Sequence, residues 1–219
     1  MTVQQERTDV PLSKDPDVPE PTGGEPRFKR LSAEDRAGEL VRAGLEVLAT
    51  GGITAFTIYN ICKKAGASRG LIGHHFGGKD GLLAACYAAA YAPLLQMLQA
   101  GSGTLELPDM IDELFSARHF RRDGLNIWLA LWGEIAVNPA LQAEHLRHYR
   151  AYEAAVTQSI TDFARAKGRK VDAATLATTL IALLDGLWLE LCIAPGLMSL
   201  ERARHAVLSL LEPQLGPLP

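Results

Sequence analysis

The sequence predicts an all-α protein, and three observations support this prediction. Apolar residues recur at three- and four-residue steps through most of the chain, the pattern of helices with one buried face. Ser, Thr, Asp or Asn precede many of these segments, and Gly or Pro follows them, as at helix starts and stops. No segment shows sustained alternation of apolar and polar residues between turn signals, so we expect no β-sheet.

The first predicted helix begins at Ser32, which can form a capping box with Asp35, and ends at Gly51-Gly52. Its apolar residues lie on one stripe, which is expected to cover the helices that follow. The stripe consists of Ala37, Leu40, Val41, Gly44, Leu45 and Leu48.

Residues 57–76 are predicted to form two short helices joined by a tight turn. Thr57 caps the first helix, and Gly66 supplies a left-handed backbone just after its end. Ser68 caps the second, which runs from Arg69 to Phe76. Two helices that cross around a short turn containing Gly form a helix-turn-helix unit, and its second helix can lie in the major groove of DNA.

The rest of the chain is predicted to form a second helical region. A long Ala-rich helix should run from Asp80 to about Ala100, followed by helices at 109–119, 125–137, 138–166, 172–194 and 199–211. We therefore expect three parts: a Pro-rich, disordered extension at 1–26, a helix-turn-helix domain at 27–80 and a helical body at 81–219.

Charge is distributed unevenly along the chain, whose net charge is −3. Residues 1–26 hold two basic and six acidic residues, giving −4, whereas residues 27–80 hold nine basic and five acidic residues, giving +4. Positive charge around the helix-turn-helix is the footprint expected for contact with phosphates.

Composition and motifs exclude several classes of protein. Three widely spaced cysteines, Cys62, Cys86 and Cys192, match neither a zinc site nor a disulfide framework, so we expect a reducing, cytoplasmic location and no metal. Residues 1–16 lack the apolar run of a signal peptide. The apolar run 175–194 contains two acidic residues, which favours a buried helix over a membrane span. Since no nucleophile elbow, P-loop or dinucleotide fingerprint is present, we expect neither an enzyme nor a bound cofactor.

The segment 65–83, AGASRGLIGHHFGGKDGLL, resembles the DNA-binding segment of the tetracycline-repressor (TetR) family of bacterial regulators. The matching residues are Ala65, Gly66, Ser68, Gly70, Ile72, His75, Phe76, Lys79, Leu82 and Leu83. The sequence departs from the family at Gly73, where most members carry Tyr. The betaine-pathway repressor (BetI-like) group also lacks this Tyr, and segments 126–142 and 182–193 resemble the helices of that group.

The resemblance implies a ligand-responsive, dimeric regulator of transcription, most often a repressor. The implied partners are a double-stranded, near-palindromic DNA operator, a small-molecule inducer such as choline or a related quaternary amine, and a second copy held through the last two helices. The body at 81–219 would then bind the ligand and form the dimer.

The predicted second helix of the helix-turn-helix carries side chains that suit DNA contact. Arg69 can reach guanine O6/N7 or a phosphate, Leu71 can contact thymine methyl groups, and His74 can bond to a phosphate or base edge. Ile72 and Phe76 are expected in the core, with His75 packed against a neighbouring helix. The predicted DNA-contacting residues, including a basic arm before the first helix, are Lys29, Arg30, Thr57, Ser68, Arg69, Gly70, Leu71, His74 and Lys79.

The body carries a candidate site for a cation. Trp128 and Trp132 share one helix face, as do Asp185 and Trp188. Trp rings attract a quaternary ammonium by cation–π interaction, roughly 0.5–2 kcal/mol per ring, and the carboxylate would offset the ligand's charge. We predict that these four residues bind the ligand. Alternatively, the rings only pack the core or the dimer contact.

Other interpretations remain open at this stage. The same fold can act as a small-molecule-binding or interaction protein without DNA reading, an alternative favoured by Gly73 and the acidic extension. The regulator can also respond to an unrelated fatty acyl or aromatic ligand.

The polar residues between His145 and Tyr152 are expected to form a solvated, charged surface. Gly186 is expected where another helix packs closely.

Overall fold

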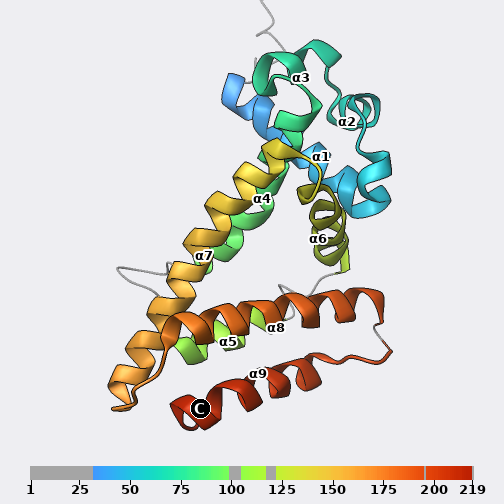
Figure 1. The fold of residues 1–219 in the computed structure, drawn as a ribbon. Helices are drawn as coiled ribbons and strands as arrows, with labels where there is room; N and C mark the ends of the chain where they lie inside the picture. The colour runs from blue at the N-terminus through green and yellow to red at the C-terminus, as the bar shows by residue number, and fades with distance from the viewer. Residues whose placement is uncertain (1–31, 99–104, 117–121, 195, 219) are drawn as a thin grey trace, which may run out of the picture. The chain divides into compact units, whose positions relative to one another are not determined.

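The described part of the chain is built from helices. The computed structural model describes residues 32–98, 105–116, 122–194 and 196–218, and it contains no strand within these ranges. This confirms the predicted all-α fold; Lys29, Arg30 and the predicted extension lie outside the described residues. The helices labelled in Figure 1 are α1 (Ala33–Ala55), α2 (Ile58–Ala65), α3 (Arg69–Phe76), α4 (Lys79–Leu98), α5 (Leu107–Leu114), α6 (Arg122–Ile135), α7 (Pro139–Ala166), α8 (Ala173–Ile193) and α9 (Leu200–Leu215).

Capping side chains confirm several of the predicted helix starts. The Ser32 hydroxyl accepts a hydrogen bond from the Asp35 amide at 3.0 Å, completing the predicted capping box of α1. Asn138 Oδ1 accepts from the amides of Ala140 and Leu141 at 3.1 and 3.2 Å. Each bond satisfies an amide that has no partner within its helix. The residues that cap α2, α8 and α9 in the same way are Thr57, Asp172 and Ser199.

The predicted end of the first helix coincides with a break in α1. We expected Gly51-Gly52 to end the first helix, but α1 extends to Ala55. The backbone breaks at Gly52, whose φ is 61°, a value that Gly adopts without the steric cost other residues meet. The last turn of α1 is thereby redirected and leads into Phe56, whose side chain is fully buried.

Helices α1–α3, which we call the reading head, are held against the N-terminal part of α4. Gly44 allows α1 to approach α4 closely, because a Cβ atom at this position would lie 2.6 Å from Cys86 Sγ. Helix α2 packs on α1, and α3 packs on α4. The fully buried side chains of this region include Leu40, Leu48, Phe56, Ile61, Ile72 and Leu82.

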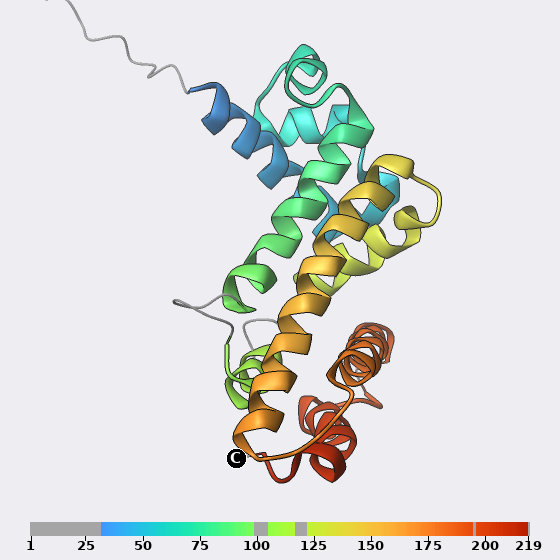
Figure 2. The same ribbon diagram turned by 60° about the vertical axis from the view of Figure 1, so that its left-hand side comes forward.

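Helices α4 and α7 run side by side through the body, as Figures 1 and 2 show from two directions. Asp80 of α4 is bonded to Asn138 at the start of α7, and Tyr87 of α4 is bonded to His145 of α7. Both pairs are 58 residues apart in the chain, so the two helices run parallel and in register.

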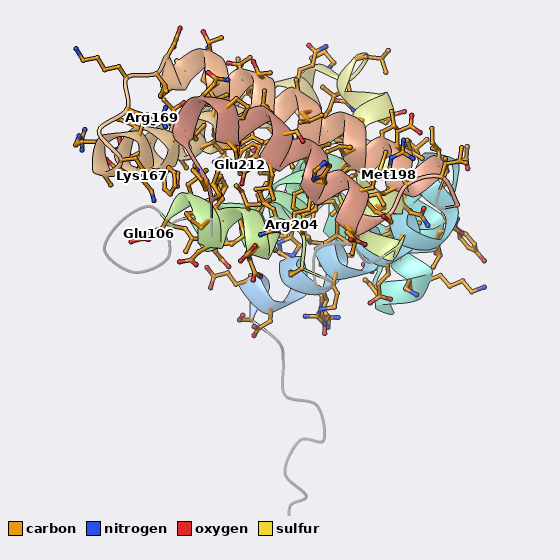
Figure 3. The ribbon with its side chains drawn as sticks, turned by 90° about the horizontal axis from the view of Figure 1, so that it is seen from below. Glu106, Lys167, Arg169, Met198, Arg204 and Glu212 are labelled. Atoms are coloured by element: carbon orange, nitrogen blue, oxygen red, sulfur yellow. The ribbon has the colours of Figure 1, made fainter. Side chains whose placement is uncertain are left out.

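Helices α8 and α9 complete the body. Helix α8 packs on α7 and α6, and α9 packs on α8. Figure 3 shows Arg204 of α9, and this side chain is paired with Asp112 of α5, with 2.6 Å between Nη2 and Oδ1. Helix α9 thus contacts α8 by packing and α5 through a partly exposed ion pair.

Within the described ranges, two helices are long and apolar enough, by length and composition alone, to cross a membrane: α4 and the segment Ala173–Leu191 of α8. Helix α4 is packed against α1, α3 and α7, and α8 is packed against α6, α7 and α9. Both therefore serve as core helices of this fold. Helix α8 is less completely covered than we expected, since one of its faces stays exposed in the protomer.

Candidate functional site

The reading head exposes most of the side chains predicted to contact DNA. Arg69, Gly70 and His74 of α3 are exposed, as is Lys79 at the start of α4. Gly77, which ends α3, has φ 72°, so the chain turns sharply between α3 and Lys79. The basic and hydrogen-bonding groups of this surface thus come from consecutive short elements.

Thr57 precedes α2 and Ser68 precedes α3, and only the Thr57 hydroxyl makes a capping hydrogen bond. Thr57 is exposed, and its hydroxyl accepts from the Asn60 amide at 3.2 Å. Ser68 is also exposed, and its hydroxyl makes no capping hydrogen bond to α3. The first amides of α3 and the Ser68 hydroxyl can therefore both bond to an anion, which the helix N-terminus also favours electrostatically.

The core side of α3 matches the prediction, with one qualification. Ile72 is fully buried, Phe76 is partly buried against the core and His75 is half-buried. Leu71, however, was predicted to face DNA, and it is half-buried and packs against the same core. Its position one residue before Ile72 turns part of the side chain inward, so only the rest can reach a thymine methyl group.

Two exposed residues of α2 were missed by the sequence prediction. Tyr59 is 57% exposed, and the guanidinium carbon of Arg69 lies 5.9 Å from the centre of its ring. Lys63, four residues later, is exposed on the same helix face. The spacing of Tyr59 and Lys63 was the available signal, because the opposite face of α2 carries the buried Ile61 and Cys62.

A pocket in the body collects all four residues predicted to bind a ligand. It lies among α4, α6, α7 and α8, and its cavity volume is about 30 Å³. Trp128 and Trp132 come from α6, and Asp185 and Trp188 from α8. The complete lining is Tyr91, Leu94, Trp128, Trp132, His145, Tyr149, Tyr152, Leu184, Asp185 and Trp188.

Aromatic rings of α4, α6 and α7 pack against one another at this pocket. Tyr91 meets Trp128 edge to face, with ring centres 5.1 Å apart and an interplanar angle of 87°. Tyr91 also stacks on His148 at 5.4 Å and 18°. His145 and Tyr149 lie 5.4 Å apart on α7. These contacts fix the orientation of the rings at the pocket.

Asp185 is the acidic group of the pocket. Its side chain reaches solvent in the protomer, yet the surrounding protein removes enough water to raise the pKa of its carboxyl from 3.8 to about 6. The carboxylate is therefore ionised at neutral pH but incompletely solvated. A ligand cation would restore part of the lost stabilisation of this charge.

The other titratable groups of the pocket are held neutral. Burial raises the pKa values of Tyr91, Tyr149 and Tyr152, and it lowers the pKa of His145. No Lys or Arg is found among the described residues that line the pocket. Asp185 thus gives the pocket a net negative charge at neutral pH.

The expected solvated surface between His145 and Tyr152 is wrong for four of its residues. His148 is 7% exposed and Tyr152 is 5% exposed, while His145 and Tyr149 are half-buried in the pocket wall. Their spacing of three and four residues places them on one face of α7, against α4 and α8. The intervening Arg147 and Arg150 are exposed, as predicted.

The described residues contain no group of three or more His, Cys, Asp or Glu side chains that could hold a metal ion. His148 Nε2 lies 3.2 Å from Glu144 Oε2 and 2.9 Å from Arg147 Nη2. The pocket lining thus combines aromatic rings with one carboxylate, that of Asp185.

Comparison with known families assigns both halves of the chain. Residues 40–86 match the family described as bacterial regulatory proteins, tetR family. Residues 106–216 match the family described as BetI-type transcriptional repressor, C-terminal. These ranges contain the reading head from Leu40 onward and most of the body.

Individual proteins agree with this assignment. The chain is 31% identical over 186 residues to the HTH-type transcriptional regulator BetI 1 of Chromohalobacter salexigens, covering 82% of this chain and 90% of that protein. It is 30% identical over 188 residues to BetI of Ectopseudomonas mendocina, covering 82% and 93%.

Solved structures share the fold. A structure from Pseudomonas aeruginosa PAO1, assigned as a transcriptional regulator, aligns with a TM-score of 0.74 and 31% identity, covering 85% of this chain and 93% of that one. A structure from Saccharomonospora viridis, assigned as a transcriptional regulator and solved in complex with choline, aligns with a TM-score of 0.67 and 21% identity. The alignment covers 83% of this chain and 97% of that one. The chain therefore belongs to the TetR family of transcriptional regulators and carries a C-terminal region of the BetI repressor type.

Proposed function

We propose that this protein is a dimeric repressor that binds a near-palindromic DNA operator and is released from it by a small organic cation, with choline or betaine aldehyde as the first candidates. The observation that carries the ligand assignment is the pocket in which Asp185 lies among Trp128, Trp132 and Trp188. The exposed surface of α2 and α3 carries the DNA assignment.

The exposed side chains of the reading head favour DNA binding over the alternative of a protein that keeps the fold without DNA reading. Arg69, His74 and Lys79 remain exposed, and Tyr59 and Lys63 extend the same surface. Two such heads, one turn of DNA apart at roughly 34–36 Å, would enter successive major grooves. The absence of Tyr at position 73 removes one contact, but Gly73 is exposed and leaves the face open. The protein would act in the cytoplasm, where the operator lies.

The pocket supports a cation over the alternative ligands. The rings stabilise a quaternary ammonium by cation–π interaction, and Asp185 offsets its charge. A fatty acid would bring a second carboxylate next to Asp185 and meet no cationic side chain among the described lining residues. The choline complex of the S. viridis structure and the BetI relatives are consistent with this ligand class.

Binding to DNA upstream of the protein's own gene, with and without choline or betaine aldehyde, tests the proposal. Fluorescence anisotropy at moderate salt is the measurement. We expect tight, sequence-specific binding that either compound weakens. Binding that ignores both compounds would reject the cation as inducer and keep the DNA regulator. No specific binding would reject the regulator and favour a protein that kept the fold without DNA reading.

We further propose that the dimer forms through α8 and α9. The face of α8 that stays exposed in the protomer carries mainly small residues at helical spacing, with Ile193 and one charged residue, Glu190, near its end, and a second copy can cover it. A Cβ atom at Gly186 would meet no atom within 4 Å in the protomer, so nothing in the single chain requires Gly there. The residues of this face are Thr175, Thr178, Thr179, Ala182, Gly186, Glu190 and Ile193.

Replacing Gly186 by Arg is expected to raise the dimer dissociation constant by about 30-fold or more. The side chain would enter the symmetric interface twice, and each insertion costs roughly 1–3 kcal/mol. Sedimentation equilibrium measures the change. Gly133→Arg is the matched control, because Gly133 is also an exposed helical Gly with no atom near its Cβ position. Equal dimer affinity for both variants would contradict an interface on this face of α8.

A further inference from the structure

The parallel helices α4 and α7 connect the pocket to the reading head. Helix α4 begins at Lys79, beside the end of the recognition helix α3, and contributes Tyr91 and Leu94 to the pocket wall further along. Helix α7, packed beside α4, contributes His145 and Tyr149 to the pocket wall. Any shift of α7 against α4 therefore changes the pocket and the position of the head together.

Two directional hydrogen bonds fix this register. The Tyr87 hydroxyl lies 2.8 Å from His145 Nδ1. Seven residues earlier on both helices, Asn138 Nδ2 donates to Asp80 Oδ1 at 3.2 Å. Apolar contacts along a helix pair tolerate small sliding motions, whereas a hydrogen bond weakens steeply when its distance or angle changes. These two bonds are thus the contacts between the helices that are most sensitive to a shift.

Tyr87 is placed to sense the pocket without lining it. It is fully buried and meets the Trp128 ring edge to face, with ring centres 5.7 Å apart. Its hydroxyl partner, His145, does line the pocket. Burial keeps Tyr87 protonated by raising its pKa, so the hydroxyl is available for hydrogen bonding at any physiological pH. A ligand that displaces the His145 ring must therefore strain or break the bond to Tyr87.

The other hydrogen bond lies next to the DNA-binding residues. Asn138 caps α7 through its Oδ1 and reaches Asp80 through its Nδ2, so one side chain joins the start of α7 to the first turn of α4. Asp80 follows Lys79 directly in the chain. A movement of α7 would thus shift the first turn of α4, which follows the end of the recognition helix.

We infer that Tyr87 is a coupling residue: its hydrogen bond to His145 links occupation of the pocket to the position of the reading head, and the Asn138–Asp80 bond completes the link. The inference rests on the proposed function and adds the residues through which the ligand acts. A ligand shifts an equilibrium only by its difference in affinity for the two states. The Tyr87–His145 bond supplies such a difference. It is intact in the ligand-free pocket and is lost in a pocket where the ligand has displaced the His145 ring.

The test separates ligand binding from the response to the ligand. For wild type and Tyr87→Phe, choline binding is measured by calorimetry, and operator affinity is measured without and with saturating choline. Tyr87→Phe keeps the packed ring and removes only the hydroxyl. We expect its choline affinity and its ligand-free operator affinity to stay within about threefold of wild type. We define the choline factor as the operator dissociation constant with saturating choline divided by the constant without it. This factor should fall by about 3- to 10-fold, which corresponds to the net contribution of one hydrogen bond.

Two further variants sharpen the result. Tyr149→Phe removes a hydroxyl from the pocket wall itself and should keep the wild-type factor at saturating choline, whatever its choline affinity. Asn138→Ser keeps a side chain that can cap α7 but removes the amide donor to Asp80, so it should lower the factor as Tyr87→Phe does. It also tests the link if Tyr87→Phe fails to fold.

The outcomes are distinct. A wild-type factor in both Tyr87→Phe and Asn138→Ser overturns the coupling role and leaves the proposed function intact. A wild-type protein whose operator binding ignores choline and betaine aldehyde overturns the ligand part of the proposed function and this inference with it. Loss of the response in Tyr87→Phe with retained choline binding supports the inference, since a merely structural role would lower both.

Discussion

Replacing Arg69 and Lys79 together by Ala is expected to weaken operator binding by at least about 100-fold. Both side chains are exposed on the reading head, Arg69 at the first position of α3 and Lys79 just after its end. A lost base contact costs roughly 1–3 kcal/mol, and a symmetric dimer loses each contact twice. The effect should therefore be the largest of any surface substitution in the protein.

The salt dependence distinguishes the roles of the two residues. Loss of a phosphate contact lowers the slope of log K against log salt by about 0.9 per contact, so Lys79→Ala alone should reduce it by roughly 2 in the dimer. Arg69→Ala should in addition relax the preference between operator and unrelated DNA if it reads a base. Anisotropy titrations at several salt concentrations measure both quantities.

Lys170→Ala is the control for this experiment. Lys170 is also exposed, but it lies between α7 and α8, outside the reading head. Its removal changes the net charge as the removal of Lys79 does, so a similar loss of affinity would show a general charge effect. Unchanged operator affinity in the Arg69/Lys79 variant would contradict the assigned reading surface.

Replacing Asp185 by Asn is expected to lower choline affinity by about 10- to 100-fold, or roughly 1.4–2.8 kcal/mol, while ligand-free operator binding is retained. The substitution keeps the size of the side chain and removes its charge. The expected loss is moderate for a charge pair because the carboxylate reaches solvent, which screens the attraction. Calorimetric titration with choline measures the change.

The same variant should lose the pH dependence of choline binding. In the wild type, the Asp185 carboxyl has a pKa of about 6, so it becomes protonated and neutral below this pH, whereas choline keeps its charge. Affinity should then fall as pH is lowered from 7 to 5. Burial lowers the pKa of His145, which moves its protonation away from neutral pH, and the pocket tyrosines stay protonated because burial raises their pKa values.

A neutral ligand of similar size gives the control. The uncharged analogue 3,3-dimethyl-1-butanol should bind wild type and Asp185→Asn equally and with little dependence on pH. If choline bound both forms of the protein with the same affinity and pH profile, Asp185 would have no part in recognising the cation, and the pocket would be a purely aromatic one.

The helix-turn-helix was predictable because its structure is encoded over short distances. Thr57 and Ser68 precede their helices, and Gly66 and Gly77 take the left-handed backbone that ends them. Each of these preferences depends on a few neighbouring residues, so no knowledge of the remaining fold was needed. Gly52 acts locally in the same way, because its positive φ breaks α1 where the sequence predicts that the first helix ends.

The pocket was only partly predictable. The four-residue spacing of Trp128 and Trp132 placed them on one face of α6, and Asp185 and Trp188 shared a face of α8 by similar spacing. That the two faces meet depends on how α6 packs on α8. On α7, His145 and Tyr149 had suitable spacing as well, but their moderate polarity and the arginines beside them made that face look solvated.

The sequence by itself determined the all-α fold, the positions of the caps and turns, and the family, because these depend on residue spacing and on an ordered local motif. Only the tertiary structure decided which polar side chains are buried and which distant residues meet. The Tyr87–His145 bond joins residues 58 positions apart, and no periodicity within either helix specifies it. Such pairs form because the buried faces of α4 and α7 pack against each other. Side chains there must fit a close-packed interior, and buried polar groups need hydrogen-bond partners.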